Sequence, residues 1–134
     1  MTSVLLDSSA LLAHYFGESR GEVVRDHLAS GEALIAAPTC FEFRTRLTAL
    51  GVPDAVSGDA LKRYRLAFSE VVSVDDAVVD RAWEIRRATP TRLPTVDAFI
   101  AACASVRGAT LIHADEHMAA IPTSLVSQVR LPPR

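Results

Sequence analysis

The chain has 134 residues, a length that fits one domain better than two. Its residues are 49% hydrophobic, which excludes disorder as the main state, and no uncharged apolar run is long enough to span a membrane. With 14 basic and 16 acidic residues, the formal net charge of −2 argues against a strongly basic nucleic-acid-binding domain. The first residues lack the basic segment of a secretory signal, so the expected location is the cytoplasm.

Short apolar runs alternate with helical patterns along the whole chain. In chain order we expect a strand over residues 3–6, helices over 8–16 and 22–30, a strand over 33–37, helices over 38–50 and 54–68, a strand over 71–74, helices over 76–88 and 95–107, a strand over 109–112, a helical turn over 116–120 and a last strand over 125–129. This alternation predicts an α/β fold, with one domain over residues 1–134. A central parallel sheet of about four to five strands should carry helices on both faces. Residues 131–134 are expected to fray.

Four acidic residues stand at positions where such a sheet places functional groups. Ligands of an open parallel sheet bind outside the carboxyl ends of the strands. Asp7 and Asp115 follow the first and the fourth expected strand. Glu42 and Asp97 lie near the starts of two expected helices. Carboxylates gathered at one edge repel one another, and a divalent cation with oxygen ligands relieves that repulsion.

Each acid also has a purely structural explanation. Asp7 and Asp115 could cap the helices that follow them. Asp97 could offset the dipole of its helix, and Glu42 could pair with Arg46 one turn later. A zinc site is disfavoured, because the segment HADEH does not match HExxH and the two cysteines lack CxxC spacing.

Four segments resemble the PIN-domain ribonucleases, and most closely the short VapC-type toxins of toxin–antitoxin pairs. They are VLLDSSAL (4–11), PTCFE (38–42), LPTVDAFIAACA (93–104) and LIHAD (111–115). The resemblance covers nearly the whole chain in length and in order of elements. It departs at His113, where the family usually has Thr or Ser two residues before the acid. The hydroxyl that would support Asp115 is therefore missing.

The resemblance implies a metal-dependent endoribonuclease that leaves a 5′-phosphate and a 3′-hydroxyl on RNA. It implies that four acids are the catalytic residues and hold Mg²⁺ or Mn²⁺, partly through water: Asp7, Glu42, Asp97 and Asp115. Ser8 would hydrogen-bond a ligand or a bound water molecule. The resemblance also implies inhibition by a VapB-type antitoxin and assembly into a homodimer.

The expected RNA contacts are basic residues near the acids. Arg92 lies in the proline-flanked loop before Asp97 and is the first candidate for a phosphate contact. His113, beside Asp115, could also touch a substrate phosphate. Weaker candidates are Arg44, Arg46, Arg86 and Arg87.

A non-catalytic interaction or RNA-binding module with the same fold remains the alternative. Two apolar helix faces could receive an antitoxin, form a dimer contact or simply pack in the core. They are Val23, Val24 and Leu28 on one helix, and Leu61, Tyr64 and Phe68 on another.

Overall fold

The computed structural model describes residues 3–134 and forms one α/β domain. The strands are β1 (Val4–Leu6), β2 (Ala33–Ala36), β3 (Glu70–Val72), β4 (Thr110–His113) and β5 (Gln128–Arg130). The helices are α1 (Ser8–Tyr15), α2 (Glu22–Ser30), α3 (Ala37–Ala49), α4 (Asp54–Ala67), α5 (Asp76–Ala88), α6 (Thr95–Arg107) and α7 (Glu116–Ala119), with one 3₁₀ turn, η1 (Ser19–Gly21).

The five strands form one sheet in the order β3-β2-β1-β4-β5, and every neighbouring pair is parallel. The chain builds outward from β1 through β2 to β3, and then crosses to the other side of β1 for β4 and β5. Strand order therefore reverses between β1 and β4, which is where parallel α/β sheets open a crevice for ligands. The expected parallel sheet is confirmed, with five strands.

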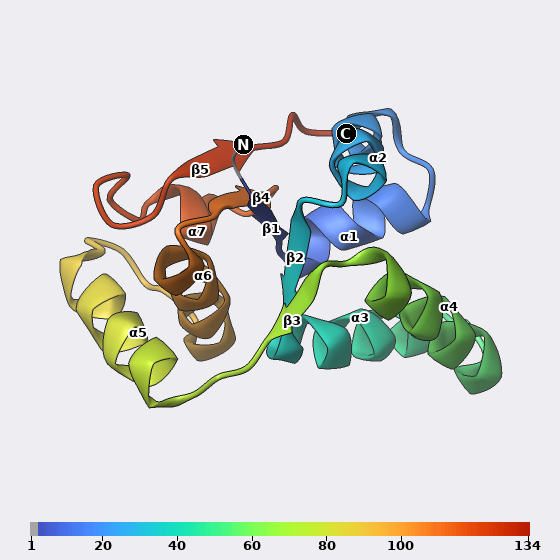
Figure 1. Cartoon of the computed structure of the whole chain (residues 1–134), viewed down its shortest axis with the longest axis horizontal. Coiled ribbons are helices and arrows are strands. Elements are labelled where there is room, and N and C mark those ends of the chain that lie inside the picture. The colour runs from blue at the N-terminus through green and yellow to red at the C-terminus, as the bar shows by residue number, and fades with distance from the viewer. Residues whose placement is uncertain (1–2) are drawn as a thin grey trace.

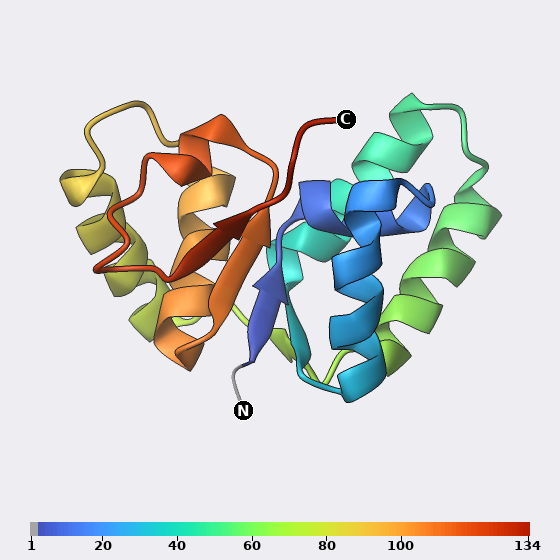
Figure 2. The same ribbon diagram turned by 90° about the horizontal axis from the view of Figure 1, so that it is seen from above.

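Helices cover both faces of the sheet, as expected (Figures 1 and 2). Along β1, Leu5 points to one face and Val4 and Leu6 point to the other, because side chains alternate along a strand. Leu5 belongs to the core beneath α5 and α6. Val4 and Leu6 belong to the core beneath α1, α2, α3 and α4. All three side chains are at least 96% buried (4%, 0% and 0% exposed for Val4, Leu5 and Leu6), so β1 is a central strand.

The ends of several helices follow from local chemistry that the sequence displays. Asp7 and Asp75 cap α1 and α5 by accepting a backbone N–H with their side chains. Gly31 and Gly108 end α2 and α6 in the left-handed region, with φ of 75° and 63°. The expected helices over residues 22–30, 76–88 and 95–107 are confirmed to the residue.

The end of the chain differs from the prediction in two ways. The last strand spans Gln128–Arg130 rather than residues 125–129, because Val126 packs into the core from a turn. The prediction that residues 131–134 fray is wrong for the first of them, Leu131. Leu131 is buried and its N–H donates to the carbonyl of His113 at 2.7 Å. The Pro132 carbonyl then accepts a bond from the Arg20 guanidinium at 3.4 Å.

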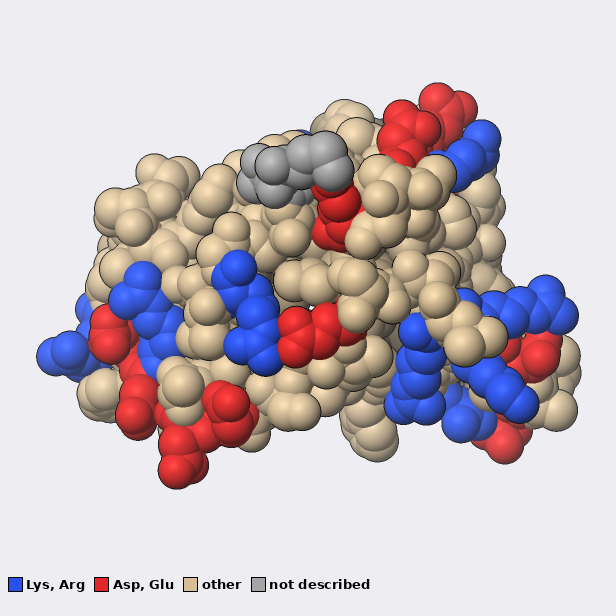
Figure 3. Space-filling view, viewed as in Figure 1, with Lys and Arg blue, Asp and Glu red and all other residues tan. Residues whose placement is uncertain are grey.

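Charges of both signs alternate across the face of the molecule drawn in Figure 3. Several charged residues of the molecule form exposed ion pairs, such as Arg63 with Asp59 and Arg107 with Glu70. Pairs of this kind contribute little to stability, about 0–1 kcal/mol each. Within residues 3–134, no helix has the length and apolar character needed to cross a membrane.

Candidate functional site

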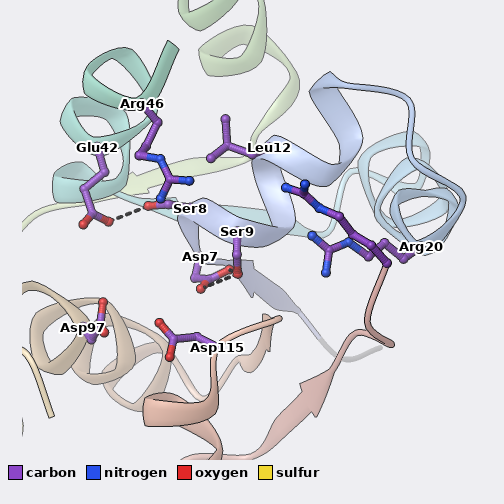
Figure 4. A pocket seen from close by; sticks show the side chains of 10 residues that line it. Asp7, Ser8, Ser9, Leu12, Arg20, Glu42, Arg46, Asp97 and Asp115 are labelled. Carbon is purple, nitrogen blue, oxygen red and sulfur yellow. Dashed lines mark hydrogen bonds between the residues drawn. The ribbon is translucent and has the colours of Figure 1, made fainter. Parts of the chain in front are cut away.

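A polar pocket opens at the carboxyl ends of β1 and β4, the point at which strand order reverses. The four acids singled out from the sequence all line it, although they come from four separate parts of the chain: Asp7, Glu42, Asp97 and Asp115. Figure 4 shows Glu42 on one side of the pocket, Asp97 and Asp115 on the other, and Asp7 between them. The pocket has a volume of about 160 Å³.

Asp7 is the most buried acid of the pocket, with 3% of its surface exposed. Its backbone N–H donates to the carbonyl of Ile112 at the end of β4. Its Oδ1 accepts the N–H of Ala10 at 2.9 Å, which caps α1. Burial raises the pKa of Asp7 to about 7, and the charges of Asp115 and Asp97 add to this rise. The cap predicted for Asp7 is present, and the same carboxyl also faces the pocket.

Asp97 lies in the first turn of α6 and Asp115 caps α7. The pKa of Asp97 is raised to about 6. Partial burial is the main cause, and the negative charges of Asp115 and Glu42 raise the pKa further. The Asp115 carboxylate accepts the N–H of His117 at 2.7 Å. These carboxylates therefore sit close enough to oppose each other's ionisation, as expected for acids gathered at one edge.

Glu42, in the second turn of α3, accepts a hydrogen bond from the Ser8 hydroxyl (Figure 4). This contact joins α3 to the first residue of α1. The pairing of Glu42 with Arg46 considered from the sequence is not formed. Arg46 has no carboxylate partner among residues 3–134, and its guanidinium lines the pocket beside the acids. Glu42 is thus held by a hydroxyl, which leaves the nearby cation unpaired.

Ser9 is a pocket residue that sequence reasoning missed. Its hydroxyl lies 2.7 Å from Oδ1 and 2.8 Å from Oδ2 of Asp7, and it accepts the N–H of Ala114 at 2.9 Å. One hydroxyl therefore connects the loop after β1 to the loop after β4. The available signal was a hydroxyl residue two positions after a capping Asp, which is a common local arrangement.

Two further arginines, Arg20 and Arg134, also line the pocket and were not anticipated. Arg20 donates to Glu18 at 2.7 Å, and Arg134 lies 3.6 Å from the same carboxylate. Arg20 belongs to η1, and Arg134 belongs to the segment that follows β5. Nothing in the local sequence indicates that these segments meet, so only the fold reveals the contact.

The substrate contact of His113 stays a prediction, and the structure places this residue outside the pocket. Its side chain is fully buried, and its ring contacts Gln128 at 2.7 Å rather than the pocket. Burial lowers the pKa of His113. Arg92 is exposed in the loop before α6 and does not line the pocket, so its phosphate contact stays a prediction.

The donor set of the pocket fits a hydrated divalent cation. Over the residues that the structure describes, no three His, Cys, Asp or Glu side chains are arranged to hold an ion directly. Mg²⁺ usually keeps several waters and needs only one or two direct carboxylates. The volume of about 160 Å³ exceeds the roughly 30 Å³ that each water occupies in the liquid. Burial first, and the neighbouring carboxylates after it, raise the pKa values of Asp7 and Asp97, and a bound cation would offset both effects.

Comparison with known proteins identifies a matching family and several solved structures with a similar fold. The family model described as PIN domain matches residues 4–123. None of the curated proteins searched matches the chain.

Three solved structures illustrate the likeness in fold. VapBC2 from Rickettsia felis, bound to a DNA fragment from its promoter, is 13% identical with a TM-score of 0.77, covering 96% of this chain and 98% of its own. A toxin–antitoxin complex from Klebsiella pneumoniae is 20% identical with a TM-score of 0.68, covering 90% and 93%. VapC20 from Mycobacterium tuberculosis, a toxin that cleaves the sarcin–ricin loop, is 21% identical with a TM-score of 0.62, covering 81% and 87%.

Proposed function

The chain belongs to the PIN domain family, and on that premise we propose that it is a Mg²⁺- or Mn²⁺-dependent endoribonuclease toxin of a toxin–antitoxin pair. It would hydrolyse phosphodiester bonds of RNA, single-stranded or in a structured loop, and leave a 5′-phosphate and a 3′-hydroxyl. The observation that carries the proposal is the meeting of four carboxylates from distant segments in one pocket, where the pKa of Asp7 is raised to about 7 and that of Asp97 to about 6.

The proposed metal ligands are the four acids, in part through water: Asp7, Glu42, Asp97 and Asp115. A bound cation would supply Lewis acidity, which makes water a better nucleophile and stabilises charge on the phosphate oxygens. The protein's own part is to hold these carboxylates in place. Ser9 fixes the orientation of Asp7 from one side of the pocket. Ser8 does the same for Glu42 from the other.

Arg46 and Arg20 are the proposed contacts for the RNA backbone. Both line the same pocket as the acids, and they approach it from different helical segments (Figure 4). Arg20 is tied to Glu18, whereas Arg46 is unpaired among residues 3–134. A guanidinium binds two phosphate oxygens at once, so an unpaired one beside a catalytic pocket suits a phosphodiester. Arg92 is a further candidate on the loop before α6.

A VapB-type antitoxin is the proposed inhibitor, and the cytoplasm is the proposed site of action. Support comes from the fold neighbours that are themselves toxin–antitoxin complexes. Of the apolar faces expected for a partner, Val24, Leu61 and Phe68 are buried in the core. Leu28 and Tyr64 instead line a surface groove formed by α1, α2 and α4, which could receive an antitoxin or a second copy in a homodimer.

The deciding experiment is RNA cleavage by purified protein that carries no antitoxin. Wild type, Asp97→Asn and Asp76→Asn would be compared with Mg²⁺, with Mn²⁺ and with EDTA. Asp76 is exposed at the start of α5 and does not line the pocket, so it is a matched control. We expect metal-dependent cleavage by wild type and Asp76→Asn, and none by Asp97→Asn. If wild type neither cleaves RNA nor gains thermal stability from either metal, the protein is a non-catalytic PIN-fold module instead.

A further inference from the structure

A series of hydrogen bonds runs from the edge of the sheet to Asp115. The Gln128 amide nitrogen donates to the carbonyl of Ile121 at 2.9 Å. The Gln128 amide oxygen lies 2.7 Å from Nε2 of His113. Nδ1 of the same ring lies 3.1 Å from the backbone nitrogen of Asp115. Two side chains therefore connect β5, through β4, to the backbone of a residue in the pocket.

The direction of each bond is fixed by the backbone groups at the two ends. A carbonyl can only accept, so the NH₂ of Gln128 must face Ile121 and its oxygen must face His113. The N–H of Asp115 can only donate, so Nδ1 of His113 must be an acceptor. The proton of His113 then sits on Nε2, which donates to Gln128. All three bonds agree on one neutral tautomer.

We propose that His113 and Gln128 are positioning residues that hold Asp115 at the pocket, an inference that rests on the proposed role of Asp115 as a metal ligand. His113 is fully buried and does not line the pocket. Its effect is exerted on Asp115, whose backbone N–H it accepts while the carboxylate of that residue accepts the N–H of His117. The loop after β4 is thus held at its backbone and at its side chain.

The acceptor at position 113 matters more than the ring that carries it. A hydroxyl two residues before an acid can accept the same N–H, so Thr would replace the ring nitrogen in this one respect. Val has the shape of Thr but no acceptor. His113→Thr and His113→Val therefore leave similar space around Gln128 and differ chiefly in the bond to Asp115.

The test compares these two variants for binding of Mn²⁺ alone, measured as metal-induced thermal stabilisation. Loss of a group that orients a metal ligand typically weakens metal affinity by about 10- to 100-fold. We expect the Mn²⁺ affinity of His113→Val to be weaker by a factor in this range, and that of His113→Thr to stay within about threefold of wild type. Equal Mn²⁺ affinity of the two variants would overturn the proposal. The readout is the shift that metal induces, so a general loss of stability in both variants does not affect it.

A second measurement needs neither metal nor RNA. The ¹⁵N spectrum of the His113 imidazole should report a proton on Nε2 at neutral pH, and Gln128→Leu should disturb that tautomer and the amide resonance of Asp115. A proton on Nδ1 in wild type would overturn the proposal. If wild type fails to bind metal or to cleave RNA, the proposed nuclease function fails. The imidazole and amide spectra still decide whether His113 holds Asp115.

Discussion

The hydroxyl of Ser9 contacts both oxygens of Asp7, at 2.7 and 2.8 Å, and accepts the N–H of Ala114 at 2.9 Å. Ser9 and Ala114 are 105 positions apart in the chain. The hydroxyl therefore joins the two loops that carry Asp7 and Asp115, and it does so beside a carboxyl that is 3% exposed. A substitution at Ser9 should therefore alter the pocket and lower the stability of the fold.

Ser9→Ala should lower the free energy of unfolding by about 1–3 kcal/mol, because a partly buried N–H and a buried carboxyl both lose a partner. Cleavage should fall as well, since Asp7 loses the contact that orients it. Urea unfolding and RNA cleavage measure the two effects. Ser30→Ala is the control, because Ser30 bonds only a nearby carbonyl on an exposed helix end. Similar unfolding of both variants would show that the link to Ala114 contributes little.

Asp7→Asn should remove the contribution of Asp7 to the pH dependence of stability of the metal-free protein between about pH 4 and pH 7. The unfolded chain releases this proton near pH 3.8, whereas burial holds the pKa of folded Asp7 at about 7. Between these values Asp7 binds more protons in the folded state than in the unfolded state, so its contribution to stability falls as pH rises and levels off above pH 7. The full effect is at most a few kcal/mol, at about 1.4 kcal/mol per pKa unit.

Urea unfolding of both proteins in EDTA at pH 5 and pH 8 tests the direction of this pH dependence. The stability of Asp7→Asn relative to wild type should be greater at pH 8 than at pH 5, because the comparison of the two proteins isolates Asp7 from other titrating groups such as Asp97 and His113. Asn keeps an oxygen that can accept the N–H of Ala10, so the cap of α1 is retained. A stability difference between the two proteins that is the same at pH 5 and pH 8 would contradict the assignment.

Mg²⁺ should stabilise wild type because it binds only the folded state, by about 2.7 kcal/mol at a free concentration 100 times its Kd. Asp97→Asn should lose this stabilisation, since the amide removes a negative charge from the pocket. Asp76→Asn, outside the pocket, should keep it. Calorimetric unfolding with Mg²⁺ and with EDTA measures the difference. Equal gains for the two variants would exclude Asp97 as a ligand.

Arg46→Ala should raise KM for RNA about tenfold and leave kcat nearly unchanged, because a hydrogen bond to a charged group contributes about 1.5 kcal/mol or more. Arg63→Ala is the control. Arg63 is paired with Asp59 on the exposed side of α4 and does not line the acidic pocket. Steady-state cleavage of a short RNA measures both constants. A large fall in kcat with constant KM would assign Arg46 to the reaction itself.

Gly21→Ala should destabilise the protein by about 1–3 kcal/mol, the usual cost of overpacking. A Cβ at Gly21 would lie 2.8 Å from the backbone carbon and oxygen of Ala13, and neither atom can move aside easily. The η1 turn would have to shift, and Arg20 with it. Ser19→Ala, in the same turn, should have a much smaller effect. Thermal unfolding of the two variants tests this comparison.

Features set by neighbouring residues were predictable from the sequence. The bounds of α6 follow from Pro94 before its first residue and Gly108 after its last. The positions of Asp7 and Asp115 at one edge followed from the order of strands alone. Features set by distant contacts were not predictable. His113 resembles a polar strand end in the sequence, and only the pairing of β4 with β5 shows that Gln128 covers it.

The arginines of the pocket illustrate the same limit. Arg46 sits one turn after Glu42, and helical spacing alone favours an ion pair between them. The Ser8 hydroxyl competes for that carboxylate, and it belongs to another helix. Arg134 lies in the segment 131–134, which the sequence alone predicts to fray. The burial of Leu131, just before it, is a tertiary effect that no local pattern contains.

The wide separation of the pocket residues along the chain also bears on how the protein is made. Asp7 is translated first, yet its partners at the sheet centre come from β4, and the Ser9–Ala114 bond spans 105 positions. A ribosome-bound chain that has not yet extruded β4 lacks half of the pocket and one neighbour of β1. Contacts this distant in sequence slow folding, because they close a long loop at an entropic cost. Assembly of the acidic pocket therefore waits until β4 and Asp115 have been made, so a nascent chain that ends before them has no intact site.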